Sequence, residues 1–521
     1  MTFGYRPLGR RRTLAAAAAA GAYAALIGWP GIRGATGATL AAEATPFTVP
    51  WLQDQVRELA SRPFEPPAAE LPAVLTDLTY DQYRDIRFRQ DHALWRDLGL
   101  TFQVQFFHPG FYHREPVKLF EVVDGAARAL QYDPSLFDYG ETGIDPATLS
   151  PEIGFAGFRL HYPLNRPDYL DEVAVFLGAS YFRAVGRGNG YGISARGLAV
   201  NTALPEGEEF PAFRSFWLER PREGAADMTM HALLDSPSVA GAYSFVLRPG
   251  QPTVMEVEAF LVARSAISLI GIAPLTSMYF FGENDRMGVD DYRPEVHDSD
   301  GLSIWHGGGE WLWRPVVNPA ELVVTPFADD SPRGFGLLQR DRAYRSYEDL
   351  QSHPQLRPSL WVEPLTRWGP GEIRLIEIPS NEEIHDNIVA FWVPKEPVAA
   401  GASLQMSYRL HWGDQPPFQA PGGLVLATRV GPGETENARR FVLDFGGGQL
   451  SQLSTETALE AVVSTSSGTV PLVVVEVNQP MGGWRAFFDF VPDGDNLADL
   501  RCFLRHQDQV LSETWSYRWM R

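Results

Sequence analysis

Short runs of alternating apolar and polar residues dominate the chain. Each run is ended within a few residues by Gly, Pro, Asn or Asp, and clear examples are 100–107, 173–182, 253–264 and 374–378. Alternation with a period of two is typical of strands with one buried face, and frequent turn residues between such runs are typical of β-sandwiches and barrels. The pattern therefore predicts an all-β protein.

Helical patterns are few. One helix is predicted over 49–60, with Pro46 ahead of it, and a second over 80–86, where Thr79 and Asp81 offer capping groups. Strands and helices do not alternate along the chain, and that argues against a doubly wound parallel sheet.

A change in composition near 394–403, where prolines give way to alanines and a glycine, predicts a domain boundary. We expect a first domain over 45–394, a linker over 395–403 and a second domain over 404–521. Strand-like runs in the second domain lie at 404–412, 425–430, 440–444, 470–477, 483–490 and 500–505. Their spacing, over the roughly 120 residues of this region, predicts one immunoglobulin-like sandwich.

Residues 1–44 have the order of a secretory signal, with arginines at 10–12, an alanine-rich run over 15–27 and the Ala-Glu-Ala cleavage-site triplet at 42–44. The arginines precede a weakly apolar stretch, and this favours the twin-arginine route, so we expect a periplasmic protein. The stretch is shorter than the about 20 residues that span a bilayer, so no membrane insertion is expected.

The composition narrows the range of partners. A formal net charge of −20 repels nucleic acid and anionic lipid, so neither is expected as a partner. Cys502 is the one cysteine of the chain and stands in an apolar run, so no internal disulfide can form and a buried thiol is predicted. The sequence does not predict the oligomeric state.

Several candidate motifs lack the context that their chemistry needs. The glycine-rich segment 186–192 opens no helix, so it is interpreted as a turn that allows close backbone approach and not as a phosphate loop. His297 has Asp298 and Asp300 nearby, but no second histidine or cysteine cluster accompanies them, so neither a metal site nor a cofactor is predicted. The chain also has no GxSxG motif of a serine hydrolase.

Carboxylates beside aromatic residues are the remaining signal. The acidic stretch 290–302 runs into Trp305 and Trp311, and tryptophan side chains stack on sugar faces. The same pattern also fits an acidic surface loop ahead of a tryptophan-rich core strand. Asp386 stands directly before the apolar run 388–392, where burial can raise its pKa and suit it to donate a proton. A simple turn that starts the strand is the alternative.

Six segments carry a resemblance to a known family. They are 180–184 (Ser-Tyr-Phe-Arg-Ala), 273–278 (Ala-Pro-Leu-Thr-Ser-Met), 293–302 (Arg-Pro-Glu-Val-His-Asp-Ser-Asp-Gly-Leu), 309–315 (Gly-Glu-Trp-Leu-Trp-Arg-Pro), 334–342 (Gly-Phe-Gly-Leu-Leu-Gln-Arg-Asp-Arg) and 386–392 (Asp-Asn-Ile-Val-Ala-Phe-Trp). The chain resembles the osmoregulated periplasmic glucan biosynthesis proteins of the G and D types, and its signal is similar to that of the D-type members.

The resemblance implies a large N-terminal β-sandwich of the galactose-mutarotase-like type and a C-terminal immunoglobulin-like sandwich. It also implies inverting glycoside hydrolysis of linear β-1,2-glucan, with Asp386 as general acid. Asp298 would accept the proton of the attacking water through a relay, because an inverting enzyme needs two carboxylates on opposite sides of the bond. The expected substrate contacts are Glu383, Arg357, Asp300, Trp305, Trp311 and Tyr191.

One departure from the family leaves the activity open. Hydrolytic members carry an aromatic hydroxyl three residues before the position of Arg357, and this chain has Pro354 there, which can neither donate nor relay a proton. A sugar hydroxyl could then be the acceptor, which makes the protein a transglycosylase. A non-catalytic glucan-binding partner of the inner-membrane glucan synthase is the other alternative. A sugar-epimerising enzyme rests on fold analogy alone.

Overall fold

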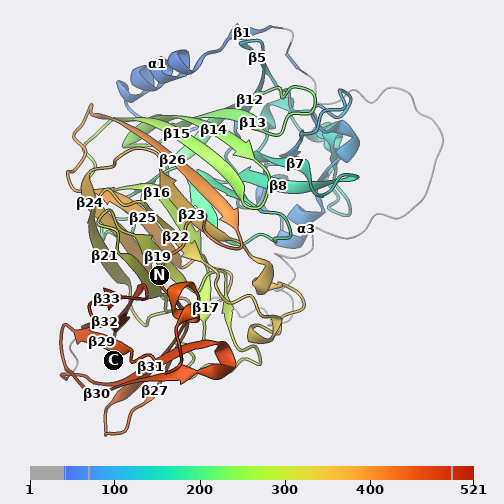
Figure 1. Cartoon of the computed structure of the whole chain (residues 1–521). Coiled ribbons are helices and arrows are strands. Elements are labelled where there is room, and N and C mark those ends of the chain that lie inside the picture. The colour runs from blue at the N-terminus through green and yellow to red at the C-terminus, as the bar shows by residue number, and fades with distance from the viewer. Residues whose placement is uncertain (1–39, 42, 68–70, 495–496, 521) are drawn as a thin grey trace, which may run out of the picture.

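The computed structural model describes residues 40–41, 43–67, 71–494 and 497–520 (Figure 1). The arginines and the alanine-rich run of the expected signal lie outside these residues. Within the described part of the chain, no helix is both long and apolar enough to cross a membrane.

The protein is nearly all β, as the sequence predicts, and is built on two large sheets. The longer sheet has the spatial order β1 (Thr45–Pro46), β5 (Ala126–Ala129), β4 (Lys118–Val123), β12 (Ala212–Glu219), β13 (Met228–Asp235), β14 (Val239–Arg248), β15 (Thr253–Ala263), β26 (Ser403–Gly413), β23 (Ser359–Pro364), β22 (Gly334–Leu338), β19 (Gly301–Trp305), β20 (Trp311–Pro315), β34 (Thr514–Trp519), β32 (Ala498–His506) and β29 (Glu460–Thr465), with β33 (Gln509–Val510) beside β32.

The second sheet has the order β21 (Val323–Asp330), β24 (Pro370–Glu377), β25 (Ile388–Pro394), β16 (Ile270–Ser277), β10 (Ser194–Arg196), β9 (Tyr181–Ala184), β8 (Tyr169–Leu177), β7 (Gly157–Arg166) and β3 (Gln103–Phe107), with β11 (Ala199–Val200) beside β16. Two short pairs complete the first region: β17 (Tyr279–Phe281) with β18 (Val296–His297), and β2 (Arg87–Phe88) with β6 (Phe137–Asp138). The run predicted as one strand over 173–182 is two strands, because Gly178 and Ala179 turn the chain with positive φ.

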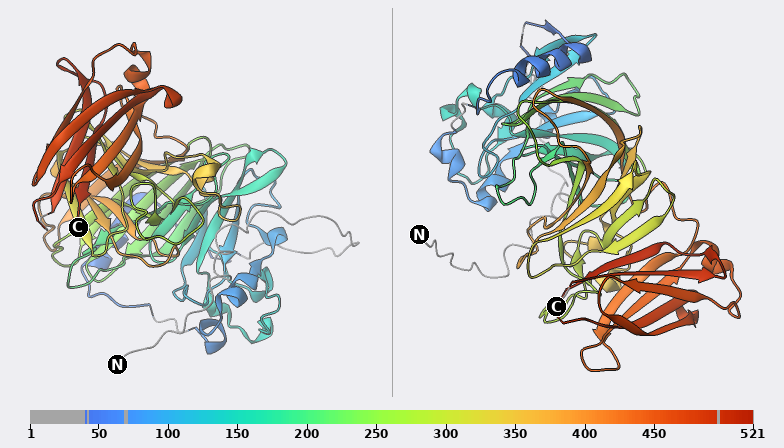
Figure 2. Two further views of the ribbon diagram at one scale, coloured as in Figure 1. Left: turned by 90° about the horizontal axis from the view of Figure 1, so that it is seen from below. Right: turned by 90° about the vertical axis from the view of Figure 1, so that its left-hand side faces the viewer.

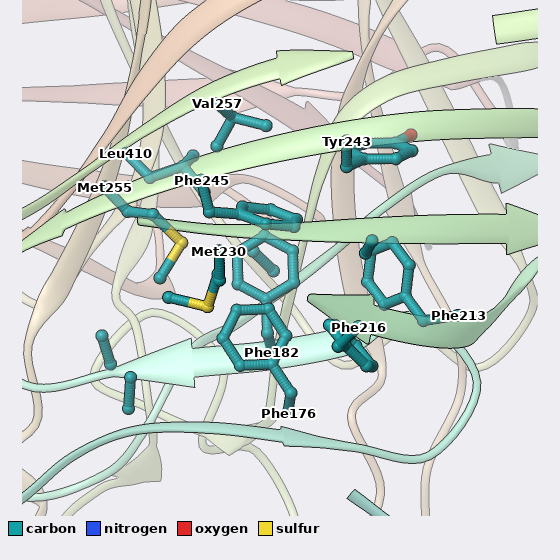
Figure 3. Close-up of a cluster of buried hydrophobic side chains, with 14 of the residues drawn as sticks. Phe176, Phe182, Phe213, Phe216, Met230, Tyr243, Phe245, Met255, Val257 and Leu410 are labelled. Carbon is teal, nitrogen blue, oxygen red and sulfur yellow. The ribbon is translucent and has the colours of Figure 1, made fainter. Parts of the chain in front are cut away.

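Aromatic side chains from the two sheets meet in the main core (Figure 3). The ring of Phe182 on β9 lies 5.4 Å from that of Phe245 on β14, and Phe176 on β8 lies 5.5 Å from Phe216 on β12. Alternate residues of each strand point into this layer, so each strand places its other residues on the outer faces. The arrangement is a β-sandwich.

The described residues form three α-helices beside the sheets: α1 (Val49–Ala60), α2 (Ala73–Thr76) and α3 (Tyr80–Asp85). The helix predicted over 49–60 is confirmed, and Thr48 caps it by accepting from the backbone N–H of Trp51. Its apolar stripe covers the outer face of the longer sheet around Trp217. The helix predicted over 80–86 ends one residue earlier, and Thr79 caps it in a capping box with Gln82.

The C-terminal strands lie at the opposite end of the molecule from α1 (Figures 1 and 2). They form a separate four-stranded sheet of β27 (Leu424–Pro432), β28 (Arg439–Gly446), β31 (Gly483–Val491) and β30 (Thr469–Asn478). This sheet shares a second core with β34 and β32 of the longer sheet. Cys502 on β32 is fully buried there, and burial raises the pKa of its thiol to about 12.

One predicted strand of the second domain lies elsewhere. The run 404–412 belongs to β26, which pairs with β15 and β23 inside the longer sheet and does not open the C-terminal sandwich. Its alternating residues, among them Leu410 and Trp412, belong to the main core. We therefore propose that the boundary between the two units lies after Gly413, and not at 395–403.

Gly336 on β22 tests the close packing of the longer sheet. A Cβ at this position would lie 2.4 Å from the carbonyl oxygen of Leu360 on β23. Because that oxygen belongs to the backbone, moving it away costs free energy. We expect Gly336→Ala to lower the free energy of unfolding by about 1–3 kcal/mol, because overpacking forces backbone shifts. Gly308→Ala is the control, since a Cβ there meets open space. Equal stability of both variants in urea denaturation would contradict the packing.

Candidate active site

Asp386 stands at the entrance of β25, and its neighbour Asn387 fixes the backbone there. The Asn387 side chain is buried, accepts from the backbone N–H of Tyr279 at 2.8 Å and donates to the carbonyl oxygens of Tyr279 and Ile378 at 2.9 and 3.1 Å. Asn387 thus supplies the turn chemistry at the start of the strand. Asp386 is left free to project from a rigid position.

The Asp386 side chain is accessible to solvent, and protein groups nearby change its pKa. Its side chain is exposed, yet burial is the main cause that raises its pKa above the usual value. The positive charges of Arg183, Arg196 and Arg357 and an interaction with the Thr276 hydroxyl act in the opposite direction. A carboxyl with a raised pKa is suited to donate a proton.

Asp298 follows β18, and an ion pair with Arg357 fixes its carboxylate. Its backbone N–H donates to Met278 at 2.8 Å, and its carboxylate pairs with the guanidinium of Arg357. Burial lowers the pKa of Arg357 to about 10, while the charges of Glu383 and Asp386 oppose that change. Arg357 therefore lies within electrostatic reach of all three acids of the predicted site.

Arg293 connects Glu383 to two further segments. Its guanidinium lies 2.8 Å from Glu383, 2.8 Å from Asp291 and 3.2 Å from Asp349. The Arg293 side chain is 8% exposed, so these ion pairs are largely removed from water. Three segments distant in sequence are thereby held together, and one of them leads directly into Asp386.

Asp300 was expected at the site, but it faces another part of the molecule. Its carboxylate accepts from the backbone N–H groups of Arg340 and Asp341 and lies 3.6 Å from Nε2 of His297. Burial raises the pKa of Asp300 to about 6. The substrate contact of Asp300 stays a prediction, and in this structure its oxygens are used by the backbone groups and lie near His297.

Glu295, His297 and Asp300 are the described residues whose ligand atoms come together as in a metal site, within 4.8 Å of one another. Gln339 accepts at Oε1 from Nδ1 of His297 at 3.0 Å, because its amide nitrogen donates to Tyr347 and to the Pro354 carbonyl. Nε2 of His297 then faces Glu295 at 2.8 Å, a hydrogen-bond distance. Burial opposes a charge on His297, but the two carboxylates outweigh it and raise the pKa. The geometry suits an imidazolium ion between two acids.

Trp305 and Trp311 pack against each other and against further aromatic residues. They face each other across β19 and β20, and their rings stack at 4.9 Å. Trp305 also contacts Phe418 at 5.3 Å, and Trp311 contacts Trp361 at 5.7 Å in the second core. The sugar contacts of both residues stay a prediction, and the packing of Trp311 is that of a tryptophan-rich core strand.

Tyr191 contacts Arg183, a neighbour of the candidate site. The guanidinium carbon of Arg183 is 4.6 Å from the centre of the Tyr191 ring. The hydroxyl of Tyr191 donates to the carbonyl oxygen of Glu172 at 3.3 Å. Gly192 explains the glycine turn, because a Cβ there would lie 2.9 Å from Cβ of Arg357. The close approach is thus to Arg357, and the segment opens no helix.

Four further residues belong to the site: Tyr181, Arg183, Arg196 and Thr276. Tyr181 and Arg183 share one face of β9, and Arg196 on β10 lies opposite Tyr181 in register. Two of the segments quoted for the resemblance, 180–184 and 273–278, contain three of these residues. Their roles depend on strand order, and sequence alternation alone does not give strand order.

Comparisons with known proteins agree with one another. The family model described as "Periplasmic glucan biosynthesis protein, MdoG" matches residues 47–519. The chain is 50% identical over 463 residues to "Glucans biosynthesis protein G" of Rhodopseudomonas palustris, covering 89% of this chain and 91% of the relative. It is 45% identical over 518 residues to "Glucans biosynthesis protein D" of Xanthomonas campestris pv. campestris, covering 98% and 97%.

Among solved structures, a GH36 α-galactosidase from Geobacillus stearothermophilus has a TM-score of 0.25 at 10% identity, covering 50% of this chain and 40% of that one. That likeness is too low to carry an argument. The family model spans both sheets of the sandwich and the C-terminal strands. The chain therefore belongs to the periplasmic glucan biosynthesis protein family, MdoG.

Proposed function

We propose that the protein acts in the periplasm on linear β-1,2-glucan by anomer-inverting glycoside cleavage or transfer. Asp386 acts as the general acid that protonates the leaving oxygen. Asp298 receives, through a relay, the proton of the attacking hydroxyl group. Residues 1–44 serve as the twin-arginine signal that exports the folded chain.

The contrast between Asp386 and Asp298 carries the proposal. Asp386 is open to solvent and has a raised pKa, whereas Asp298 is ion-paired with Arg357, and a positive neighbour favours the charged, proton-accepting form of a carboxylate. Two acids whose environments separate their protonation states are the arrangement from which an acid and a base are assigned. Arg357 interacts with both acids, which supports a single site.

Pro354 bears on the choice between hydrolysis and transfer. It is buried in a short turn before Arg357, and its carbonyl oxygen accepts from the Gln339 side chain at 3.2 Å. The nearby hydroxyl of Tyr347 donates to the carbonyl oxygen of Asp341 at 2.8 Å, so it is already engaged. A relay from water to Asp298 then lacks an aromatic hydroxyl at position 354, and this favours a sugar hydroxyl as the acceptor.

Product analysis tests the function directly. Purified protein is incubated with linear β-1,2-glucan, and the masses of the products are measured by mass spectrometry. Shorter chains that each contain one added water establish hydrolysis. Products with an unchanged number of reducing ends, or rings that lack one water, establish transfer. If the glucan binds but its chain length does not change, the protein is not the proposed enzyme but a glucan-binding partner of the glucan synthase.

Asp386→Asn removes the proton donor in that assay. We expect the rate of either reaction to fall by about 10²–10⁴-fold, the usual contribution of general acid catalysis, while glucan binding is retained. Glu382→Gln is the matched control, since Glu382 is an exposed acid of the same loop. Full activity of the Asp386→Asn variant would overturn the assignment.

The pH profile of kcat tests the protonation state of Asp386. The acid must be protonated to act, so kcat falls as the pH rises through its pKa, which lies above the usual value. The charge of Arg183 lowers that pKa, so Arg183→Met should move the basic limb of the profile to higher pH. Arg166→Met, an exposed arginine of the β7–β8 turn, should leave the limb in place. A shift to lower pH would contradict the proposal.

Arg293 is expected to act as a positioning residue. Arg293→Met removes three ion pairs and frees the segment of Glu383, and we expect kcat to fall about 10–100-fold because small displacements of reacting groups are costly. Arg293→Lys keeps one charge and should recover part of kcat. Unchanged kcat in a folded Arg293→Met protein, checked by circular dichroism, would refute this role.

A further inference from the structure

Arg196 lies between two aromatic rings beside the candidate site. Its guanidinium carbon is 4.6 Å from the ring centre of Tyr181 and 5.8 Å from that of Phe210. The guanidinium also pairs with Glu208 at 2.7 Å, and Glu208 accepts from the Thr202 hydroxyl at the same distance. The Arg196 charge is thus neutralised within the protein.

One donor of Arg196 has no acceptor. The Arg196 side chain is 7% exposed, and its Nε atom is buried without a hydrogen-bond partner among the described residues. Nε of Arg357 is in the same state. Buried donors are nearly always paired in folded proteins, so the unpaired Nε of Arg196 is a donor that an acceptor oxygen of a ligand would satisfy.

Phe210 presents an exposed ring on a rigid segment. The ring is 52% exposed, although the flanking residues are fixed. Glu209 accepts from the backbone N–H and hydroxyl of Ser238 at 3.0 and 2.6 Å and forms a bridge with Val200. Glu208 is held by Arg196. An aromatic face held in place beside an unpaired donor is suited to pack against a sugar ring.

The layer of Tyr181, Arg196 and Phe210 adjoins Asp386. The charge of Arg196 lowers the pKa of Asp386, and the charge of Asp386 raises the pKa of Tyr181. The strand register gives the geometry: β10 pairs with β16 at Thr276, and β16 pairs with β25 at Ser277 and Ile388, two residues after Asp386. The layer and the acid therefore stand on neighbouring strands of one sheet.

We propose that Tyr181, Arg196 and Phe210 form a sugar-binding subsite next to Asp386, in which a glucose unit packs on the Phe210 ring and Nε–H of Arg196 donates to a sugar oxygen. A neutral polyol fits better than an anion, because Glu208 already neutralises Arg196. The strongly negative chain also disfavours anionic ligands. The subsite rests on the proposed function.

Calorimetric titration with linear β-1,2-glucan tests the subsite. The titration uses the Asp386→Asn variant as parent, so that the chain is not consumed. Adding Phe210→Ala should weaken binding about fivefold, as expected for the loss of an aromatic contact. Phe210→Trp keeps an aromatic face and should retain the affinity. Tyr169→Ala is the control, since Tyr169 is 55% exposed at the far end of β8.

Kinetics on the active protein distinguish a binding role from a structural one. Phe210→Ala should raise KM about fivefold and leave kcat within about twofold, because the contact lies outside the reacting bond. Equal affinity of parent and Phe210→Ala would overturn the subsite and leave the proposed function intact. If the parent itself does not bind the glucan, the proposed function and the subsite both fail.

Discussion

The buried ion pair of Arg357 and Asp298 is the interaction on which the candidate site depends. A charge removed from water must be paired, and breaking such a pair costs about 3–5 kcal/mol. Gly192 leaves room for the Arg357 side chain, and the backbone of Asp298 is tied to Met278. The pair thus joins the segments before β23 and after β18. It also places the positive charge of Arg357 near Asp386 and Glu383.

The segment around Asp298 links this site to the C-terminal unit. Asp298 faces Arg357, whereas Asp300 faces a cavity of about 30 Å³ lined on its other side by 425–428 of β27. Glu283 in that cavity pairs with Arg429 at 2.9 Å, and burial raises its pKa to about 8. Arg340 pairs with Glu513 at 2.5 Å across the same contact. The C-terminal sandwich therefore supports the strand from which Asp298 projects.

Sequence alternation predicted the all-β class, both longer helices and the strand β15, because these features depend on neighbours along the chain. It assigned β26 to the wrong unit, since pairing with β15 and β23 is set by contacts far away in sequence.

Asp386, Asp298, Glu383 and Arg357 were predicted from the family resemblance, and the structure brings them together. Trp305, Trp311 and Asp300 stay predicted substrate contacts, and the structure shows the two tryptophans paired across β19 and β20 and Asp300 accepting from a backbone N–H. Arg183, Arg196 and Arg293 went unassigned because their roles depend on strand register and on contacts between loops.

The central claim is that Asp386 donates a proton to the linkage that is broken. A crystal structure of the Asp386→Asn variant with linear β-1,2-glucan bound tests this most directly. The account predicts one glycosidic oxygen within about 3 Å of the side chain at position 386, with Asp298 on the opposite side of the anomeric carbon. A glucan chain bound away from position 386, or with no linkage oxygen near it, would contradict the account.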